Sequence, residues 1–182
     1  MKRAFKAEEM LDLADTLAGR DSGRGRPRTV FLRRSVSTAY YALFHELVLH
    51  GTHRLAPRGN VEHQQAIGRW YAHGNVKKAC QWVEALATNR TPPAPVGLLL
   101  SEQGTVPRDL EVLATAFLGL QQARHDADYN PAYDVTKSAA LTHAGTARAA
   151  VEAARRLERA GSPAYDMFLL LSLGGDRLLR NN

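Results

Sequence analysis

The sequence predicts an all-α protein, an up-and-down bundle of roughly four to five main helices with additional short helices. Two observations lead to this prediction. Apolar residues recur three and four positions apart along most of the 182-residue chain, which is the period of an amphipathic helix. In addition, no segment alternates strictly between apolar and polar residues, as a half-buried strand does. We expect residues 1–160 to form one helical domain and residues 161–182 a C-terminal helix, packed on the bundle or at an oligomer contact.

The N-terminal part of the chain is expected to form two helices. The first covers residues 6–19 and ends at Gly19, a residue type that commonly ends helices. Its apolar face consists of Met10, Leu13, Ala14 and Leu17. A long second helix is expected over residues 29–50, and a segment rich in glycine and proline, which begins at Gly51, is expected to end it.

The middle of the chain is expected to contain two shorter helices, over residues 61–72 and 75–88. We expect Trp70 and Trp82 to anchor them in the core, because large aromatic rings contribute much buried area. Residues 89–107 are rich in proline and are expected to form a long connection that is either mobile or functional.

The C-terminal half is expected to form three helices. Pro107 suits the first turn of a helix, and Pro131 should end that helix because it disfavours helical geometry at the residue before it. Residues 134–160 form an alanine-rich helix whose small side chains would let a neighbour approach closely. The Ser162–Pro163 pair is typical of an N-cap and first turn, and predicts a last helix.

The net charge of +6 is concentrated in one segment. Residues 20–34 contain six arginines against one acid, Asp21. Such a cluster favours an anionic partner, such as nucleic acid, a nucleotide or a membrane surface, although a solvated loop is the alternative. The candidate nucleic-acid contacts in this loop are Arg24, Arg26 and Arg28.

Other features bear on the compartment and on the class of ligand. Cys80 is the single cysteine, so an intrachain disulfide is excluded and a reducing cytoplasmic location fits. The N-terminus lacks the apolar core of a signal peptide, and the longest apolar run, residues 167–173, is too short to span a bilayer. We therefore expect no membrane association. The histidines show no spacing typical of a metal site, and neither a metal nor a cofactor is expected.

Residues 35–48, SVSTAYYALFHELV, carry more polar side chains than a core helix needs. Residues four apart share a helix face, so one polar stripe consists of Arg33, Ser37, Tyr41 and His45. The adjacent apolar face should point to the core and consists of Val36, Tyr40, Leu43 and Leu47. The polar stripe either hydrogen-bonds to neighbouring helices or lines a ligand site.

The stretch RRSVSTAYYALFHEL and the later stretch ARHDADYN together resemble the motifs of the HEPN superfamily. The matching residues are Ser37, Tyr40, Tyr41, Ala42, Phe44 and His45 in the first motif, and Arg124, Asp128 and Tyr129 in the second. The resemblance covers roughly residues 5–160. It implies a bundle of helices and a homodimer in which the motifs face a shared cleft.

Many active HEPN proteins are metal-independent ribonucleases with an arginine and a histidine roughly four to six residues apart. Such a pair can clamp the scissile phosphate and move the proton of the attacking 2′-hydroxyl. Here Arg124 is followed directly by His125, and these two are the candidate catalytic residues. The structural alternative is an ion-pair group that ties the helix end to the second helix, and it consists of Arg124, Asp126 and Asp128 with Arg33 or Arg34.

Three functions therefore remain open. The first is a HEPN-like helical protein that binds nucleic acid or a nucleotide in a defence or toxin–antitoxin context, through Arg33, Ser37, Tyr41, His45, Asp128 and Tyr129. The second is a metal-independent ribonuclease toxin. The third is a non-catalytic dimeric scaffold. The expected partners are RNA or a nucleotide, a second copy of the chain, and an antitoxin-like protein.

Overall fold

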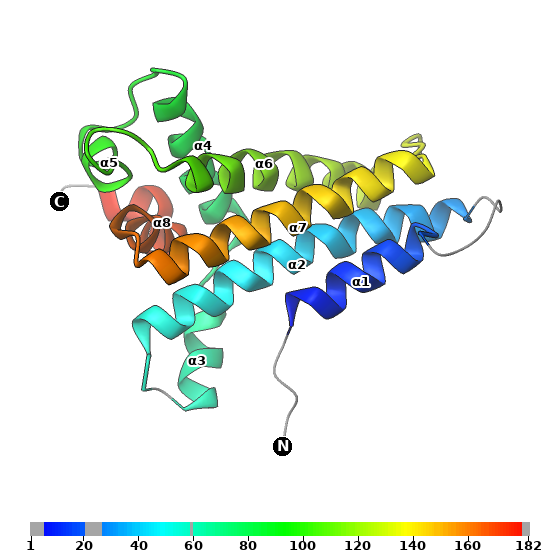
Figure 1. The fold of residues 1–182 in the computed structure, drawn as a ribbon, viewed down its shortest axis with the longest axis horizontal. Coiled ribbons are helices and arrows are strands. Elements are labelled where there is room, and N and C mark those ends of the chain that lie inside the picture. Colours follow the sequence, from blue (N-terminus) through cyan, green and yellow to red (C-terminus); the bar gives the residue numbers. More distant parts are fainter. Residues whose placement is uncertain (1–5, 21–26, 59, 180–182) are drawn as a thin grey trace.

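Helices form the body of this computed structural model, which describes residues 6–20, 27–58 and 60–179. The helices are α1 (Ala7–Leu17), α2 (Thr29–Leu55), α3 (Val61–Gly68), α4 (His73–Ala87), α5 (Ala94–Leu99), α6 (Arg108–Tyr129), α7 (Lys137–Ala160), α8 (Pro163–Gly174) and a 3₁₀ helix, η1 (Gly175–Leu179). The described ranges contain no strand. The prediction of an all-α helical bundle is confirmed (Figure 1).

The helices α1, α2, α6 and α7 run side by side along the length of the molecule (Figure 1). The chain reverses direction between α1 and α2 and again between α6 and α7, and α7 packs against both α2 and α6. The buried face of α7 is mostly alanine and includes Ala140, Ala144, Ala147, Ala150 and Ala154. These short side chains let the neighbouring helices approach α7 closely.

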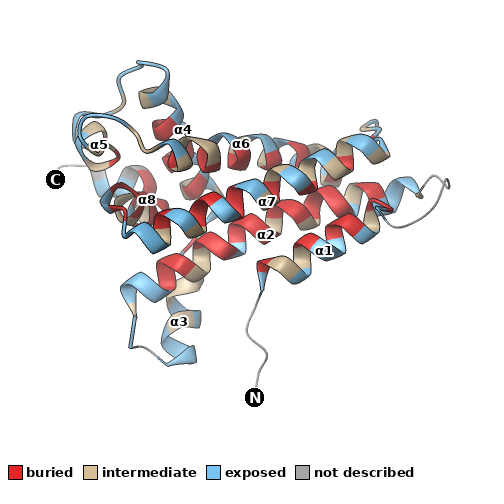
Figure 2. Ribbon diagram, viewed as in Figure 1, coloured by how far each residue is buried: buried red, intermediate tan, exposed pale blue. Residues whose placement is uncertain are grey.

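The core is built around α2, which contacts α1, α6, α7 and α8. Its expected apolar face is confirmed, because Val36, Tyr40, Leu43 and Leu47 are all buried. Figure 2 shows that buried residues follow α2 along most of its length. The polar stripe that adjoins this face is therefore carried on a firmly packed helix.

The helix break expected at Gly51 does not occur, because α2 continues through this glycine to Leu55. A Cβ atom at Gly51 would lie 1.7 Å from the hydroxyl of Tyr71. The Tyr71 hydroxyl in turn donates a hydrogen bond to the carbonyl of Leu169 at 3.2 Å. Gly51 is thus a close packing position inside a helix, and it makes room for a buried phenol.

Of the two tryptophans expected in the core, Trp82 is buried, whereas Trp70 is 65% exposed. The expectation for Trp70 is wrong because α3 ends at Gly68, so the helical period does not continue to residue 70. Tyr71 in the following link enters the core in its place.

The proline-rich connection contains a short helix, α5, that the sequence analysis did not anticipate. Pro93 is its N-cap residue and Val96 is buried against the core. Proline in a first turn removes no intrahelical hydrogen bond, so a proline-rich segment is compatible with this turn of helix.

The apolar run at residues 167–173 lies in α8, where Phe168, Leu169 and Leu171 are buried. This helix packs against α4 and α2. Within the described ranges, no helix combines the length and the apolar character needed to cross a bilayer.

Candidate functional site

The polar stripe of α2 faces the last turns of α6, and Arg33 binds the end of that helix. Its Nε donates to the carbonyl of Ala127 at 2.7 Å, and its Nη2 donates to the carbonyl of Asn130 at 2.7 Å. The last carbonyl groups of a helix lack intrahelical partners and carry partial negative charge. Arg33 therefore caps α6 through carbonyl groups, and not through the carboxylates of Asp126 or Asp128 as the structural alternative supposed.

Further along the stripe, a chain of polar contacts joins α2 to α6. The Ser37 hydroxyl donates to Oδ1 of Asp128 at 2.6 Å. Oδ2 of the same carboxylate lies 2.8 Å from Nε of Arg124, and Nη2 of Arg124 donates to the Tyr41 hydroxyl at 2.9 Å. Tyr41 and Arg124 are 83 residues apart in the chain. The two sequence motifs therefore meet in one network.

Two aromatic rings lie close to this arginine. The Arg124 guanidinium carbon is 5.5 Å from the Tyr41 ring centroid and 5.4 Å from that of Tyr129, within the range of cation–π attraction. Partial burial lowers the pKa of Arg124. The nearby Tyr41, Asp128 and Tyr129 have a larger opposite effect, so the pKa is raised overall. Arg124 is therefore a permanent cation with a well-defined position.

The histidines that the sequence analysis singled out lie beside the same two tyrosines. The His45 ring stacks on the Tyr41 ring with a centroid distance of 6.1 Å and an interplanar angle of 28°. The His125 ring lies 5.2 Å from the Tyr129 ring. Both histidines are exposed, so their imidazoles border the site at the molecular surface.

The structure adds a histidine that the sequence analysis missed. His73 is the first residue of α4, and its Nδ1 lies 2.7 Å from the buried hydroxyl of Tyr40. Burial and the positive charge of Arg124 lower the pKa of His73, so its imidazole is neutral at pH 7. The Gln121 side chain donates to the His73 carbonyl at 3.3 Å. No local pattern in the sequence marks His73, because the packing of α4 on α6 brings it to the site.

A polar cleft of about 250 Å³ opens between α4 and α6, and its lining consists of Lys77, Gln121, Gln122, Arg124 and His125. Arg124 and His125 are neighbours in the chain and project in different directions from the helix. Both nevertheless border this cleft, since α4 lies alongside α6. Lys77 and Gln121 were not predicted from the sequence as site residues.

Of the three candidate nucleic-acid contacts in the arginine-rich segment, only Arg28 can be placed relative to this cleft. Arg24 and Arg26 fall outside the described residues. Arg28 is the N-cap residue of α2. At a rise of 1.5 Å per residue, Arg28 lies about 20 Å from Tyr41 along the helix axis. Arg28 is therefore not part of the cleft.

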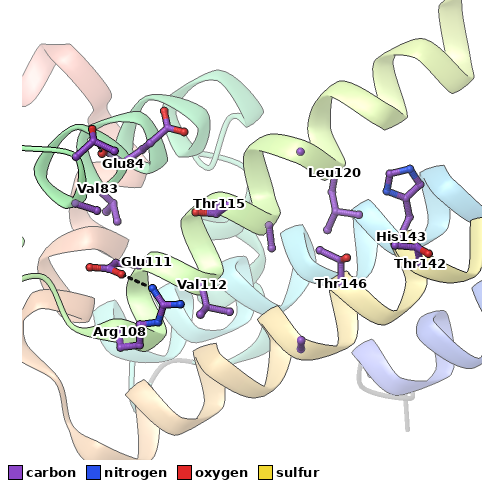
Figure 3. Close-up of a pocket in the computed structure, with 15 residues that line it drawn as sticks. Val83, Glu84, Arg108, Glu111, Val112, Thr115, Leu120, Thr142, His143 and Thr146 are labelled. Carbon is purple, nitrogen blue, oxygen red and sulfur yellow. Dashed lines mark hydrogen bonds and ion pairs between the residues drawn. The ribbon is translucent and has the colours of Figure 1, made fainter. Parts of the chain in front are cut away.

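A larger groove of about 760 Å³ follows α6 between α4 and α7, and Figure 3 shows the residues that line it. Its lining is mostly small or aliphatic. Arg108 at one end donates to Glu111 at 2.8 Å, and Glu84 pairs with Arg90 at 3.7 Å. These charges already compensate one another, so the groove shows no preference for an anion.

No group of three or more histidine, cysteine, aspartate or glutamate side chains is arranged to hold a metal ion in the described part of the chain. Comparisons with protein-family models, with curated proteins and with solved structures found no match. The candidate site is therefore defined by its own geometry.

Proposed function

We propose that this HEPN-like helical protein binds a phosphate group of RNA or of a nucleotide at the cleft beside Arg124. The observation that carries the proposal is the fixed position of the Arg124 guanidinium at the edge of a polar cleft. Arginine recognises phosphate through the planar set of donors on its guanidinium group. A guanidinium that is already held in place loses less conformational freedom when it binds.

Two of the three nitrogen atoms of the guanidinium are used to hold it. Nε forms an ion pair with Asp128 that lacks hydrogen-bond geometry, and Nη2 donates a hydrogen bond to Tyr41. The remaining nitrogen, Nη1, makes no hydrogen bond to any part of the chain that the structure describes. It is the donor that we assign to the phosphate.

The rest of the cleft suits an anion. Lys77 on α4 supplies a second cation. The amide nitrogens of Gln121 and Gln122 already donate to the His73 carbonyl and to Asp126, so the attraction for an anion comes from the two cations. Asp128 offsets one positive charge. Lys77 and Arg124 together still leave the cleft with a net positive charge, which attracts phosphate over short distances.

The HEPN resemblance is supported by the way in which its residues contact one another. Ser37 and Tyr41 of the first motif bind Asp128 and Arg124 of the second motif directly. Motif residues that form one network are what we expect if both motifs build a single site.

A second candidate function, metal-independent RNA cleavage, is favoured by the histidines around Arg124. In such a reaction Arg124 would clamp the scissile phosphate, and a neutral imidazole would accept the proton of the attacking 2′-hydroxyl. As the 2′-oxygen bonds to phosphorus, the bond from phosphorus to the 5′-oxygen of the next nucleotide would break, and that 5′-oxygen would leave with a proton from an acid or from water. His125 borders the cleft directly. His73 is neutral at pH 7 and lies against the Tyr41 ring, at a centroid distance of 5.8 Å.

The binding proposal is tested by fluorescence anisotropy with a labelled single-stranded RNA, in wild type and in Arg124→Gln. We expect the variant to lose about tenfold to a hundredfold in affinity, as for a lost charge-assisted hydrogen bond. The matched control is Arg90→Gln, which removes the same charge from an exposed arginine that does not line the cleft. Equal affinity in wild type and in Arg124→Gln would overturn the proposal.

The same RNA, incubated with a chelator and resolved on a gel, tests the ribonuclease candidate. Cleavage that persists in the chelator and disappears in Arg124→Gln would support it. Full cleavage in Arg124→Gln would remove this residue from the mechanism. If wild type neither binds nor cleaves RNA or nucleotides, while Arg124→Gln lowers the melting temperature, the network is a structural link between α2 and α6 and the scaffold hypothesis is favoured.

A further inference from the structure

The aromatic ring of Tyr129 stands out because it is exposed although it adjoins the Arg124 cleft. Tyr129 is the last residue of α6 and is 64% exposed. Other large aromatic side chains, such as Tyr40, Tyr165 and Phe117, are fully buried. An exposed aromatic ring beside a cationic cleft offers a flat apolar surface to a ligand.

Contacts with neighbouring side chains orient this ring. The Arg124 guanidinium lies 5.4 Å from its centroid, and the His125 ring lies 5.2 Å away at an interplanar angle of 48°. The same arginine therefore touches the ring and borders the cleft. A group stacked on Tyr129 would have its own phosphate within reach of Arg124.

From this arrangement we infer that Tyr129 and His125 form a nucleobase-stacking subsite, so that the ligand is a single-stranded nucleic acid or a nucleotide with an unstacked base. The inference rests on the proposed binding of phosphate at Arg124. The subsite is a second point of contact for the ligand, and it indicates that a bound nucleic acid is single-stranded.

The lining of the cleft separates the two contact points. The two cations, Lys77 and Arg124, line the cleft, whereas Tyr129 does not. We therefore assign the phosphate to the cleft and the base to the exposed ring beside it. The Tyr129 ring offers that base an aromatic surface next to Arg124 and His125.

Stacking on Tyr129 requires a base that is not already stacked within a duplex. In double-stranded RNA the bases are stacked on one another, and proteins reach mainly the backbone and the minor groove. In single strands, stacking on an aromatic side chain is tolerant of sequence and strengthens binding substantially. The subsite therefore selects single strands without selecting a sequence.

The test compares Tyr129→Leu with Tyr129→Phe, and uses as ligands a short single-stranded RNA, an abasic strand of the same length and a duplex of the same sequence. We expect Tyr129→Leu to weaken binding of the single strand by roughly five- to a hundredfold, and binding of the abasic strand hardly at all. Tyr129→Phe keeps the ring and should bind as wild type does. Wild type should bind the duplex more weakly than the single strand.

A matched control is Trp70→Leu, which removes another exposed aromatic ring, 65% exposed, from a segment outside the cleft. It should leave RNA binding unchanged. Since Tyr129 is exposed, all of these variants should keep the melting temperature of wild type within about 2 °C.

The outcomes separate the subsite from the phosphate site. If Tyr129→Leu binds the single strand as tightly as wild type does, while Arg124→Gln does not, the subsite is refuted and phosphate binding stands. If wild type binds none of the ligands, both proposals fail. If Tyr129→Leu changes the sedimentation of the protein and leaves RNA binding unchanged, the ring is a protein contact and the subsite is refuted.

Discussion

Replacing Tyr41 with phenylalanine tests whether the polar stripe of α2 acts through the hydroxyl of this residue or only through its ring. The substitution keeps the ring contacts with Tyr40, at a centroid distance of 5.3 Å, and with His45. It removes the oxygen that accepts a hydrogen bond from Nη2 of Arg124 at 2.9 Å. The change is therefore confined to one hydrogen bond of the network.

The expected size of the effect follows from the exposure of the partner. A hydrogen bond to a charged group contributes about 1.5–3 kcal/mol to stability. The Arg124 side chain is 21% exposed, so water can replace part of the lost bond. We therefore expect Tyr41→Phe to lower the free energy of unfolding by about 1–2 kcal/mol, and the melting temperature by about 2–8 °C. Differential scanning calorimetry measures both quantities.

The same variant should also weaken RNA binding, because Arg124 loses one of the two contacts that hold its guanidinium. A double-mutant cycle isolates this contact. In an Arg124→Met background, adding Tyr41→Phe should change the free energy of unfolding by less than about 0.5 kcal/mol. If Tyr41→Phe alone changes neither stability nor RNA affinity, the hydroxyl has no role in the fold or in binding, and the reasoning about this stripe is wrong.

Three further substitutions test the packing of α2. Tyr40→Ala should lower the free energy of unfolding by about 3–5 kcal/mol in urea denaturation, because the side chain is fully buried; a loss below about 1 kcal/mol would contradict its place in the core. Gly51→Ala should lower it by about 1–3 kcal/mol, although alanine favours helices, because the new Cβ would meet the Tyr71 hydroxyl; a more stable variant would refute this packing argument. Glu46→Gln should reduce the loss of stability in acid. Burial opposes the ionisation of Glu46, but its hydrogen bonds, including one from Arg155 at 2.6 Å, outweigh this and lower its pKa. The carboxylate therefore stabilises the fold above its unfolded pKa, and this contribution is lost as the pH falls through the folded pKa. Melting temperatures between about pH 7 and pH 3 should fall less steeply in Glu46→Gln than in wild type, and equal slopes would count against the role of this ion pair.

Short-range capping interactions mark the start of the last two main helices. Thr136 caps α7 by accepting a hydrogen bond from the backbone of Ala139, and Ser162 caps α8 in the same way. Gly161 adopts the left-handed conformation, with φ of 63°, that ends α7. Each of these devices involves residues a few positions apart. The Ser162–Pro163 pair therefore predicted the start of α8 correctly, whereas α7 was expected from residue 134 and begins at Lys137.

Periodicity likewise located the apolar face of α2 and the polar stripe beside it. The spacing of residues along a helix is a property of the helix alone. For the same reason, the stripe could be listed from the sequence, although what it faces could not. Ser37 and Tyr41 found their partners in Asp128 and Arg124, and these contacts depend on how α2 and α6 lie against each other.

The failures of sequence reading concern contacts between distant segments. Gly51 was predicted to begin the segment that ends the second helix, and only the position of Tyr71 shows why a glycine is needed there. Trp70 and Tyr71 are neighbours in the chain, yet the path of the link after α3 buries only the tyrosine. Propensity and periodicity describe single elements, so they cannot determine which of two adjacent aromatic rings turns inward.

The cleft itself was decided by tertiary structure. Lys77 comes from α4, whereas Arg124 and His125 come from α6. His73 reaches the network only because α4 packs on α6 and places its first residue next to Tyr40. Helix formation follows from local spacing, but the position of one helix on another follows from side-chain packing between them. For this reason the polar residues of the α2 stripe could be identified from the sequence. Lys77 and His73, which α4 contributes to the site, could be identified only from the folded chain.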